Sequence, residues 1–349
     1  MTKPLFAGCF ILLLLNVGDV ECRGHRGRDE DDDPEYKLFV FGDAAADTGN
    51  SPHTGGQISQ GSRAWYYPYG ISDDDNDNRP SGRFSDGLVQ SDFLARILGY
   101  DESPPPFADY RPRRRSNSVD PSGMNFANAS AGVWYEVPKV SEQVDQFTRL
   151  VNDGAITRED LEDSVALVAV SGRDYWRITD SNDNIYTGMF AFLVTEEMVR
   201  VVKHLQDAGV GKVLVNTLPP LGCTPATARS AGYGRCDQRG NDLSDAHNKY
   251  LNEKLGKKDG VLLLDVHAAV NNLLGSEEFR QQRSRPCCEA RDARNGYCGQ
   301  PGGSTMCRDP EDYFYWDDRN PTSAGWKAVM QQLQTPVMDF LGIQTRNNL

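Results

Sequence analysis

The sequence feature that most constrains the fold is a continuous apolar run, Val165 to Val170. Apolar side chains at successive positions are typical of a strand buried on both faces of a parallel sheet. Shorter strand-like segments lie at residues 38–41, 123–127, 213–215 and 261–265, and segments of helical periodicity lie at 140–151, 189–208, 243–255 and 324–341. This alternation predicts a three-layer α/β/α domain with a doubly wound, mainly parallel sheet.

The N-terminus has the pattern of a secretory signal peptide over residues 1–22. Lys3 precedes a mostly apolar run from Phe6 to Val17, which is too short to span a membrane, and Val20 and Cys22 suit a cleavage site. Residues 23–35 form an acidic linker, and residues 36–349 are expected to fold as a single domain. No second apolar segment approaches spanning length. We therefore predict a secreted, extracellular protein without a membrane span.

Six cysteines follow the predicted signal peptide, an even number that suits three disulfides in an oxidising compartment. Their spacing favours one bridge between Cys223 and Cys236 and two within the later cluster, although other pairings stay open. The later cluster is Cys287, Cys288, Cys298 and Cys307. An adjacent cysteine pair lacks the usual spacing of zinc ligands, so we expect no metal and no cofactor.

The net charge of −13 argues against a nucleic-acid partner, because phosphate binding depends on clustered Lys and Arg. Ligands of doubly wound folds bind beyond the carboxyl ends of the parallel strands. Four polar or glycine-rich segments are expected to lie just after predicted strands: residues 42–50 (GDAAADTGN), 125–132 (NFANASAG), 171–175 (SGRDY) and 316–322 (WDDRNPT).

These segments resemble, in order, the sequence blocks of the plant GDSL esterase/lipase family within the SGNH-hydrolase superfamily. Supporting matches lie at residues 81–87 (SGRFSDG), 218–223 (LPPLGC), 247–248 (HN) and 286–289 (PCCE). The resemblance extends from about Tyr36 to the end of the chain. It implies a flavodoxin-like SGNH-hydrolase fold, location in the apoplast or cell wall, and Ser-His-Asp ester hydrolysis with an oxyanion hole.

The sequence departs from the family's pattern at the residues that carry this chemistry. Ala44 stands at the nucleophile position, and Asn320 stands at the position of the catalytic His. Arg173 replaces the oxyanion Asn, and Ala129 replaces the oxyanion Gly, where a backbone N–H remains. Asp317 is the only residue of the triad that is retained.

Loss of the Ser or the His alone lowers turnover of such enzymes by about a millionfold. We therefore expect an inactive binding or accessory protein that takes a small ester, a lipid or an anionic ligand in the former cleft, or a protein partner. An ester hydrolase or acyltransferase with a rearranged site, using Ser130, Ser171 or Thr48, is the alternative. A storage, defence or structural protein without a small ligand is a third possibility.

Two further expectations concern charged side chains. Arg173 is expected to pair with Asp317 or Asp43, because an unpaired charge in a partly buried cleft is costly. A solvated Arg173, or one that faces outward and binds an anion such as a carboxylate, is the alternative. Asp43 and Asp174 are expected to hold loops by hydrogen bonds rather than to form a glycosidase-like acid/base pair.

The sequon Asn128-Ala129-Ser130 predicts an N-glycan at the rim of the former oxyanion hole, where it would obstruct the cleft. Burial of this segment during folding is the competing possibility. Mass spectrometry of the secreted protein before and after glycosidase treatment decides between the two, because a glycan at Asn128 would be lost as a defined mass. An unmodified Asn128 would remove the argument for an obstructed cleft.

Overall fold

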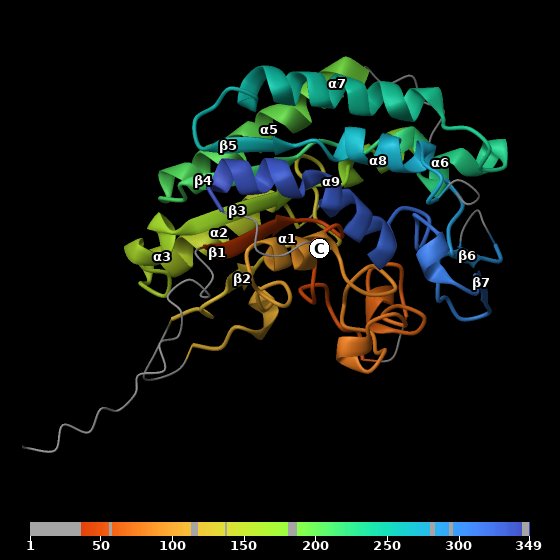
Figure 1. Cartoon of the computed structure of the whole chain (residues 1–349), viewed down its shortest axis with the longest axis horizontal. Coiled ribbons are helices and arrows are strands. Elements are labelled where there is room, and N and C mark those ends of the chain that lie inside the picture. Colours follow the sequence, from red (N-terminus) through yellow and green to blue (C-terminus); the bar gives the residue numbers. More distant parts are fainter. Residues whose placement is uncertain are drawn as a thin grey trace, which may run out of the picture. The chain divides into compact units, whose positions relative to one another are not determined.

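A five-stranded parallel sheet forms the centre of the described chain (Figure 1). Its strand order is β2-β1-β3-β4-β5, and each neighbouring pair is parallel. The strands are β1 (Lys37–Gly42), β2 (Gly123–Asn125), β3 (Ser164–Ala169), β4 (Lys212–Asn216) and β5 (Val261–Leu264). The apolar run of the sequence becomes β3, which is buried along its whole length in the middle of the sheet. The predicted three-layer fold is confirmed.

The structure is a computed structural model that describes residues 36–55, 58–112, 118–136, 138–180, 187–279, 283–292, 296–343 and 349. The predicted signal peptide at residues 1–22 and the acidic linker at 23–35 lie outside these ranges. Residues Pro34–Leu349 form one compact unit. Among the described helices, none is long and apolar enough to cross a membrane.

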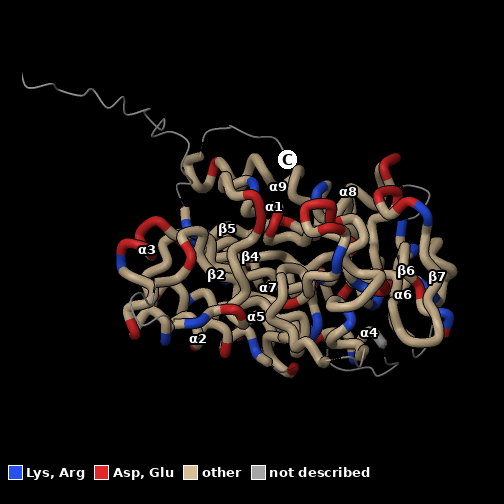
Figure 2. The backbone as a smooth tube through the Cα atoms, turned by 90° about the horizontal axis from the view of Figure 1, so that it is seen from below, with Lys and Arg blue, Asp and Glu red and all other residues tan. Residues whose placement is uncertain are grey.

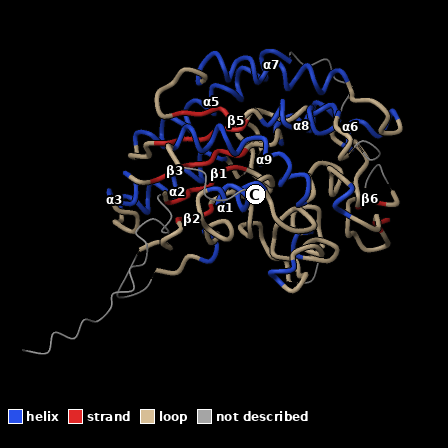
Figure 3. The backbone as a smooth tube through the Cα atoms, in the orientation of Figure 1, coloured by secondary structure: helices blue, strands red, loops and turns tan. Residues whose placement is uncertain are grey.

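Helices cover both faces of the sheet, as the ribbon and the tube show (Figures 1 and 3). One layer contains α1 (Gln90–Ile97), α8 (Val266–Gly275) and α9 (Ser323–Leu341), which pack against the even-numbered side chains of β1. The other contains α2 (Val140–Asn152), α3 (Arg158–Glu162), α5 (Thr187–Asp207) and α7 (Gln238–Leu255). The short helices α4 (Trp176–Asp180) and α6 (Pro225–Ala228) follow β3 and β4. The sequence did not predict α1 or α8.

An aromatic cluster fixes β1 beneath α2. The ring of Phe147 on α2 meets the edge of Phe39 at 5.0 Å between centroids, and Phe41 stacks on Phe126 at 5.3 Å. All four rings are fully buried or nearly so. Edge-to-face and offset-stacked rings pack favourably beyond their buried area. The carboxyl end of β1, where the first family motif begins, is therefore held rigidly.

Gly42 ends β1 with a backbone that only glycine accepts. Its φ is 140°, and a Cβ built there would lie 2.0 Å from the carbonyl oxygen of Ala169 on β3. Glycine alone permits this close approach of two strands. The chain turns out of the sheet immediately afterwards, at Asp43 and Ala44.

Three disulfides confirm the pairing that the spacing favoured. They join Cys223 to Cys236, Cys287 to Cys307, and Cys288 to Cys298. The last two enclose a small hairpin of β6 (Cys288–Ala290) and β7 (Ser304–Met306), which pair antiparallel. This hairpin was not predicted from the sequence. Within the described residues, no cluster of metal-ligating side chains is found.

Candidate functional site

The four replaced family positions lie around one cleft beyond the carboxyl ends of the parallel strands. Ala44, Ala129, Arg173 and Asn320 all line this cleft, whose volume is about 320 Å³. They come from the segments that follow β1, β2 and β3 and from the turn that precedes α9. Asp317 lies directly behind the wall and is fully buried. The structure therefore brings together, in one cleft, the four positions at which the sequence departs from the pattern of the family that it resembles.

Asp43 holds the turn that carries Ala44. Its Oδ1 accepts a hydrogen bond from the Ala45 N–H, and its Oδ2 accepts from the N–H and the hydroxyl of Ser171 after β3. Burial raises the pKa of Asp43 to about 6, although these donors oppose the shift. Asp43 thus ties the ends of β1 and β3 together, as expected for a loop-holding residue.

Asp174 performs the same task on the opposite wall. It accepts hydrogen bonds from three successive backbone N–H groups, those of Val133, Trp134 and Tyr135, at 2.7 to 2.9 Å. The side chain is almost completely buried. A buried carboxylate with three backbone donors is a structural anchor. The geometry supports the expectation of loop holding over that of an acid/base pair.

The backbone N–H at the first oxyanion position is already engaged. The N–H of Ala129 donates to Oδ2 of Asp47 at 2.8 Å, and it also lies 3.2 Å from the hydroxyl of Ser51. A donor that serves a buried carboxylate does not point freely at an oxyanion. The side-chain nitrogen of Asn128, the predicted glycan acceptor, donates to the Asn50 carbonyl at 3.1 Å.

Asp317 is the most densely hydrogen-bonded acid of the site. Its Oδ1 accepts from the backbone N–H groups of Arg319 and Asn320 at 2.9 and 2.8 Å. Its Oδ2 accepts from Tyr69 at 2.8 Å and from Nη2 of Arg63 at 2.9 Å. Burial alone would raise the pKa of Asp317, but the charge of Arg63 and these donors hold it below its ordinary value.

Arg63 is the partner of Asp317, and no sequence motif indicated this pairing. The guanidinium is buried, with Nε donating to the Tyr69 hydroxyl and Nη1 donating to the Gln60 carbonyl. It packs on the ring of Phe84, 5.0 Å from the centroid. Arg63 lies 254 residues from Asp317 and belongs to none of the recognised motifs. Only the three-dimensional contact reveals the pair.

Asn320, which stands where the resemblance places the catalytic His, contacts Asp317. Its Nδ2 donates to both oxygens of Asp317, at 2.9 and 3.0 Å. The amide thereby makes the kind of contact that an orienting Asp makes to a catalytic His. An amide nitrogen carries no basic lone pair, so it does not accept a proton from a nucleophile.

The expected pairing of Arg173 with Asp317 or Asp43 is wrong. The ion pair recorded for Arg173 joins its Nε to Glu136 at 3.9 Å, and its guanidinium stacks on Trp176, 4.7 Å from the ring centroid. Arg63 already satisfies Asp317, and backbone donors satisfy Asp43. Both acids are therefore already paired, Asp43 with Ser171 and Asp317 with an Arg that the sequence analysis had not placed at the site.

No described histidine lines the cleft. His247 is buried on α7, where its Nδ1 meets the Tyr175 hydroxyl at 2.8 Å, and burial lowers its pKa to about 3. His267 contacts the Leu218 carbonyl, and His53 packs beside Trp65. His204 lies exposed near the end of α5. The side chain of Ser130 lines the cleft, but no imidazole lies among the described residues around it.

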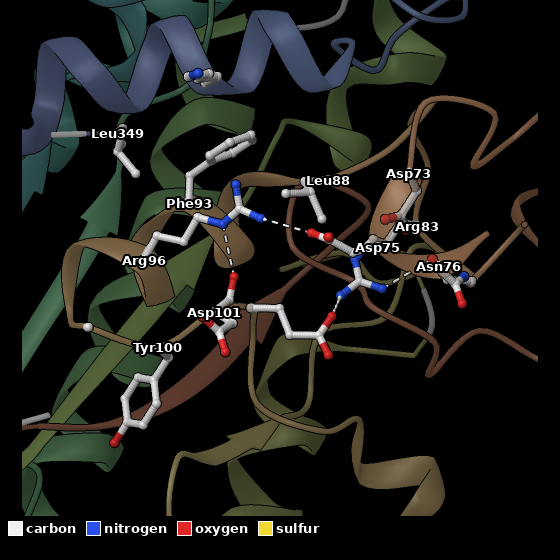
Figure 4. A pocket seen from close by; sticks show the side chains of 14 residues that line it. Asp73, Asp75, Asn76, Arg83, Leu88, Phe93, Arg96, Tyr100, Asp101 and Leu349 are labelled. Carbon is white, nitrogen blue, oxygen red and sulfur yellow. Dashed lines mark hydrogen bonds and ion pairs between the residues drawn. The ribbon is translucent and has the colours of Figure 1, made fainter. Parts of the chain in front are cut away.

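A larger groove of about 770 Å³ lies elsewhere, beside α1 and α9 (Figure 4). Its charged side chains pair with one another: Arg83 with Glu102 at 3.0 Å, and Arg96 with Asp75 at 3.6 Å. None of the replaced family positions lines it. Its size alone therefore does not make it the active-site cleft.

A sequence model of the GDSL-like lipase/acylhydrolase family matches residues 38–333. The chain belongs to this family. GDSL esterase/lipase At5g03600 of Arabidopsis thaliana is 31% identical over 329 residues, which cover 87% of this chain and 95% of that protein. GDSL esterase/lipase At5g03590 of the same plant is 33% identical over 330 residues, covering 87% and 90%.

Solved structures with a similar chain course include a catalytic variant of Axe2, an acetylxylan esterase from Geobacillus stearothermophilus. Its TM-score is 0.40 at 12% sequence identity, and the match covers 89% of this chain and 97% of that one.

Replacing Arg63 with Met is expected to destabilise the GDSL-family domain by about 3 to 5 kcal/mol at pH 7, because Asp317 would stay buried without its cation. In the wild type, the lowered pKa of Asp317 means that its contribution is present at neutral pH and lost only as the pH falls through the folded-state pKa. In the variant, burial dominates and raises that pKa, so the deficit shrinks as the medium is acidified. Urea unfolding at pH 7 and pH 5 measures both effects.

The matched control is Arg200→Met on α5, where an exposed Arg pairs with Glu197 at 2.6 Å. A surface pair contributes less than about 1 kcal/mol. If Arg63→Met behaves like this control, or if its deficit is the same at both pH values, Asp317 does not depend on Arg63.

Proposed function

We propose that this member of the GDSL family is not an ester hydrolase and acts as a secreted binding or accessory protein through its cleft. The proposal rests on the side chains found at three positions taken together. Residue 44 has no hydroxyl, residue 320 offers no base, and Asp317 is neutralised by Arg63. Acyl transfer by this family's route needs the nucleophile and the base together.

The cleft itself supports a binding role, because it persists after the loss of the catalytic groups. Its volume of about 320 Å³ lies at the lower end of the range for small-molecule sites. Asp43 and Asp174 hold its walls through backbone N–H groups, and neither depends on a catalytic side chain. A small ester, a lipid or an anionic ligand, or a protein partner, is the occupant that we propose.

The three disulfides fit an extracellular protein, because such bridges persist in oxidising compartments. Together with the signal-like N-terminus, they support our proposal of secretion to the apoplast or cell wall. Acidic and basic residues are interspersed along the described chain rather than gathered in one basic stretch (Figure 2). This distribution gives no support to a nucleic-acid partner.

Catalysis through a rearranged site is the competing proposal, and the contacts of the cleft weigh against it. Ser130 is the hydroxyl side chain on the described wall, and Glu136 is the carboxylate there. Glu136 lies within 3.9 Å of Arg173 and 3.4 Å of Arg177. Each oxygen of this carboxylate is thus paired with a cation.

The purified protein is expected to release no p-nitrophenolate from p-nitrophenyl acetate or butyrate above a heat-denatured control. It is also expected to resist labelling by a fluorophosphonate serine probe, since position 44 carries no hydroxyl. Stoichiometric labelling of any serine would support the rearranged site and overturn the proposal.

The triple variant Ala44→Ser, Arg173→Asn, Asn320→His is expected to gain measurable esterase activity. In a related mechanism, losing the whole triad costs about 2 × 10⁶ in turnover, and losing the Asp alone costs about 3 × 10⁴. Because Arg63 still neutralises Asp317, we expect a gain on the order of 10- to 100-fold over the wild type. The p-nitrophenyl butyrate assay measures it.

Ala44→Ser alone serves as the control and is expected to stay inactive, because its hydroxyl would have no base. A triple variant that folds but stays inactive would mean that the cleft differs from an active site by more than these side chains.

A further inference from the structure

Guanidinium groups dominate the wall of the cleft. Among the described residues that line it are Arg63, Arg173, Arg177 and Arg319, together with one carboxylate, Glu136. The chain as a whole carries a net charge of −13, so this concentration of cations runs against the overall composition. Buried or half-buried cations are costly unless they are paired. The pairing of each Arg therefore decides what the cleft accommodates.

Two of the four cations are committed to other groups. Arg63 is buried and donates hydrogen bonds to Tyr69, Gln60 and Asp317. Arg319 lies 3.7 Å from Asp318 and packs over Trp176 at 4.3 Å from the ring centroid. These interactions belong to the wall itself, so the two residues position their neighbours and shape the cleft.

The other two cations share one carboxylate. Arg173 and Arg177 approach Glu136 at 3.9 and 3.4 Å, longer than the roughly 2.7–2.9 Å of a charge-assisted hydrogen bond. The buried Nε of Arg173 has no hydrogen-bond partner within the described chain. Burial lowers the pKa of Arg173. The charges of Glu136 and Asp43 oppose this shift, and those of Arg63 and Arg319 add to it. An anion in the cleft would compensate this excess of positive charge.

Trp176 fixes the plane of Arg173 in the cleft. The guanidinium lies 4.7 Å from the ring centroid, so one of its faces is covered while its N–H edge stays available. A planar fork of this kind matches the two oxygens of a carboxylate. The charge at position 173 is therefore preorganised, whereas Arg177 is largely exposed and stands at the rim.

A narrow apolar slot of about 30 Å³ adjoins the cleft and shares Trp176, Arg319 and Asn320 with it. The rest of its wall is mostly apolar: Ala45, Pro219, Leu221, Val266, Val270, Phe314, Pro321 and Trp326. Because most of this wall is apolar, the slot suits a short hydrocarbon better than a charged ligand end. Its size excludes a long acyl chain unless the walls move.

We propose that the cleft binds a small organic acid as its carboxylate anion, held by Arg173 and Arg177, with a short apolar group directed to the slot beside Trp176. This inference rests on the proposed loss of hydrolysis and names the ligand class of the same cleft. An active esterase stabilises negative charge only in its transition state, whereas a permanent cation also binds a ground-state anion. A neutral ester gains nothing from that charge, and a polyanion is repelled by the net charge of −13.

The test is isothermal titration calorimetry of the full protein with sodium butyrate and with methyl butyrate at constant ionic strength. Butyrate is expected to bind at least about tenfold more tightly than its ester, because a hydrogen bond to a charged group is worth roughly a tenfold or larger factor. Arg173→Gln is expected to weaken butyrate binding roughly 10- to 100-fold and to leave methyl butyrate unchanged. Arg200→Gln, an exposed Arg with one acidic partner, is the matched control and is expected to bind like the wild type.

Circular dichroism checks that each variant is folded. If Arg173→Gln does not fold, Arg177→Gln at the exposed rim is tested in its place. Equal affinities for butyrate and methyl butyrate, or no loss in the Arg173 variant, would overturn the inference. The same samples are given p-nitrophenyl butyrate. Release of p-nitrophenolate would sink the proposed loss of catalysis, whereas no release and no butyrate binding would sink only the ligand class.

Discussion

The contact between Arg63 and Asp317 is the interaction on which the rest of the site depends. Both side chains are buried, and each is stable there only because the other is present. Tyr69 and Asn320 complete the shell around the carboxylate, so its oxygens are satisfied from several directions. The carboxylate therefore serves the fold through Arg63 and Tyr69, and it also faces the side chain at position 320.

The C-terminal cystine-linked segment adds to this arrangement from outside the sheet. The backbone N–H groups of Cys287 and Cys288 donate to the carbonyls of Tyr315 and Trp316, the two residues before Asp317. The disulfides of both cysteines restrain the partner segment. The position of Asp317 is thus set by covalent cross-links, by backbone pairing and by a buried ion pair, three constraints of different physical origin.

The sequence predicted those parts of the structure that local pattern controls. The run at residues 165–170 is apolar on both faces and became the central strand, and the helix predicted at 140–151 became α2. The sequence analysis did not predict helix α1, which has only eight residues and depends on contacts outside the helix. Its Asp92 accepts a hydrogen bond from the Val89 N–H and forms an ion pair with Arg83. The predicted pairing of Arg173 with Asp317 was wrong for a similar reason. The residue that pairs with Asp317 is Arg63, which lies in a segment without periodicity or a recognised motif. Long-range charge pairing leaves no trace in a single sequence.

The loop-holding roles of Asp43 and Asp174 have a consequence for how such a protein can change. The backbone around the cleft is fixed by acids that bind N–H groups, so the side chains at positions 44, 129 and 173 contribute little to keeping it open. The frame of the cleft and the chemistry of these three positions are therefore set largely by different residues. A chain with this architecture tolerates exchanges at these positions while it keeps the frame, so its cleft accommodates a change of ligand without a change of fold.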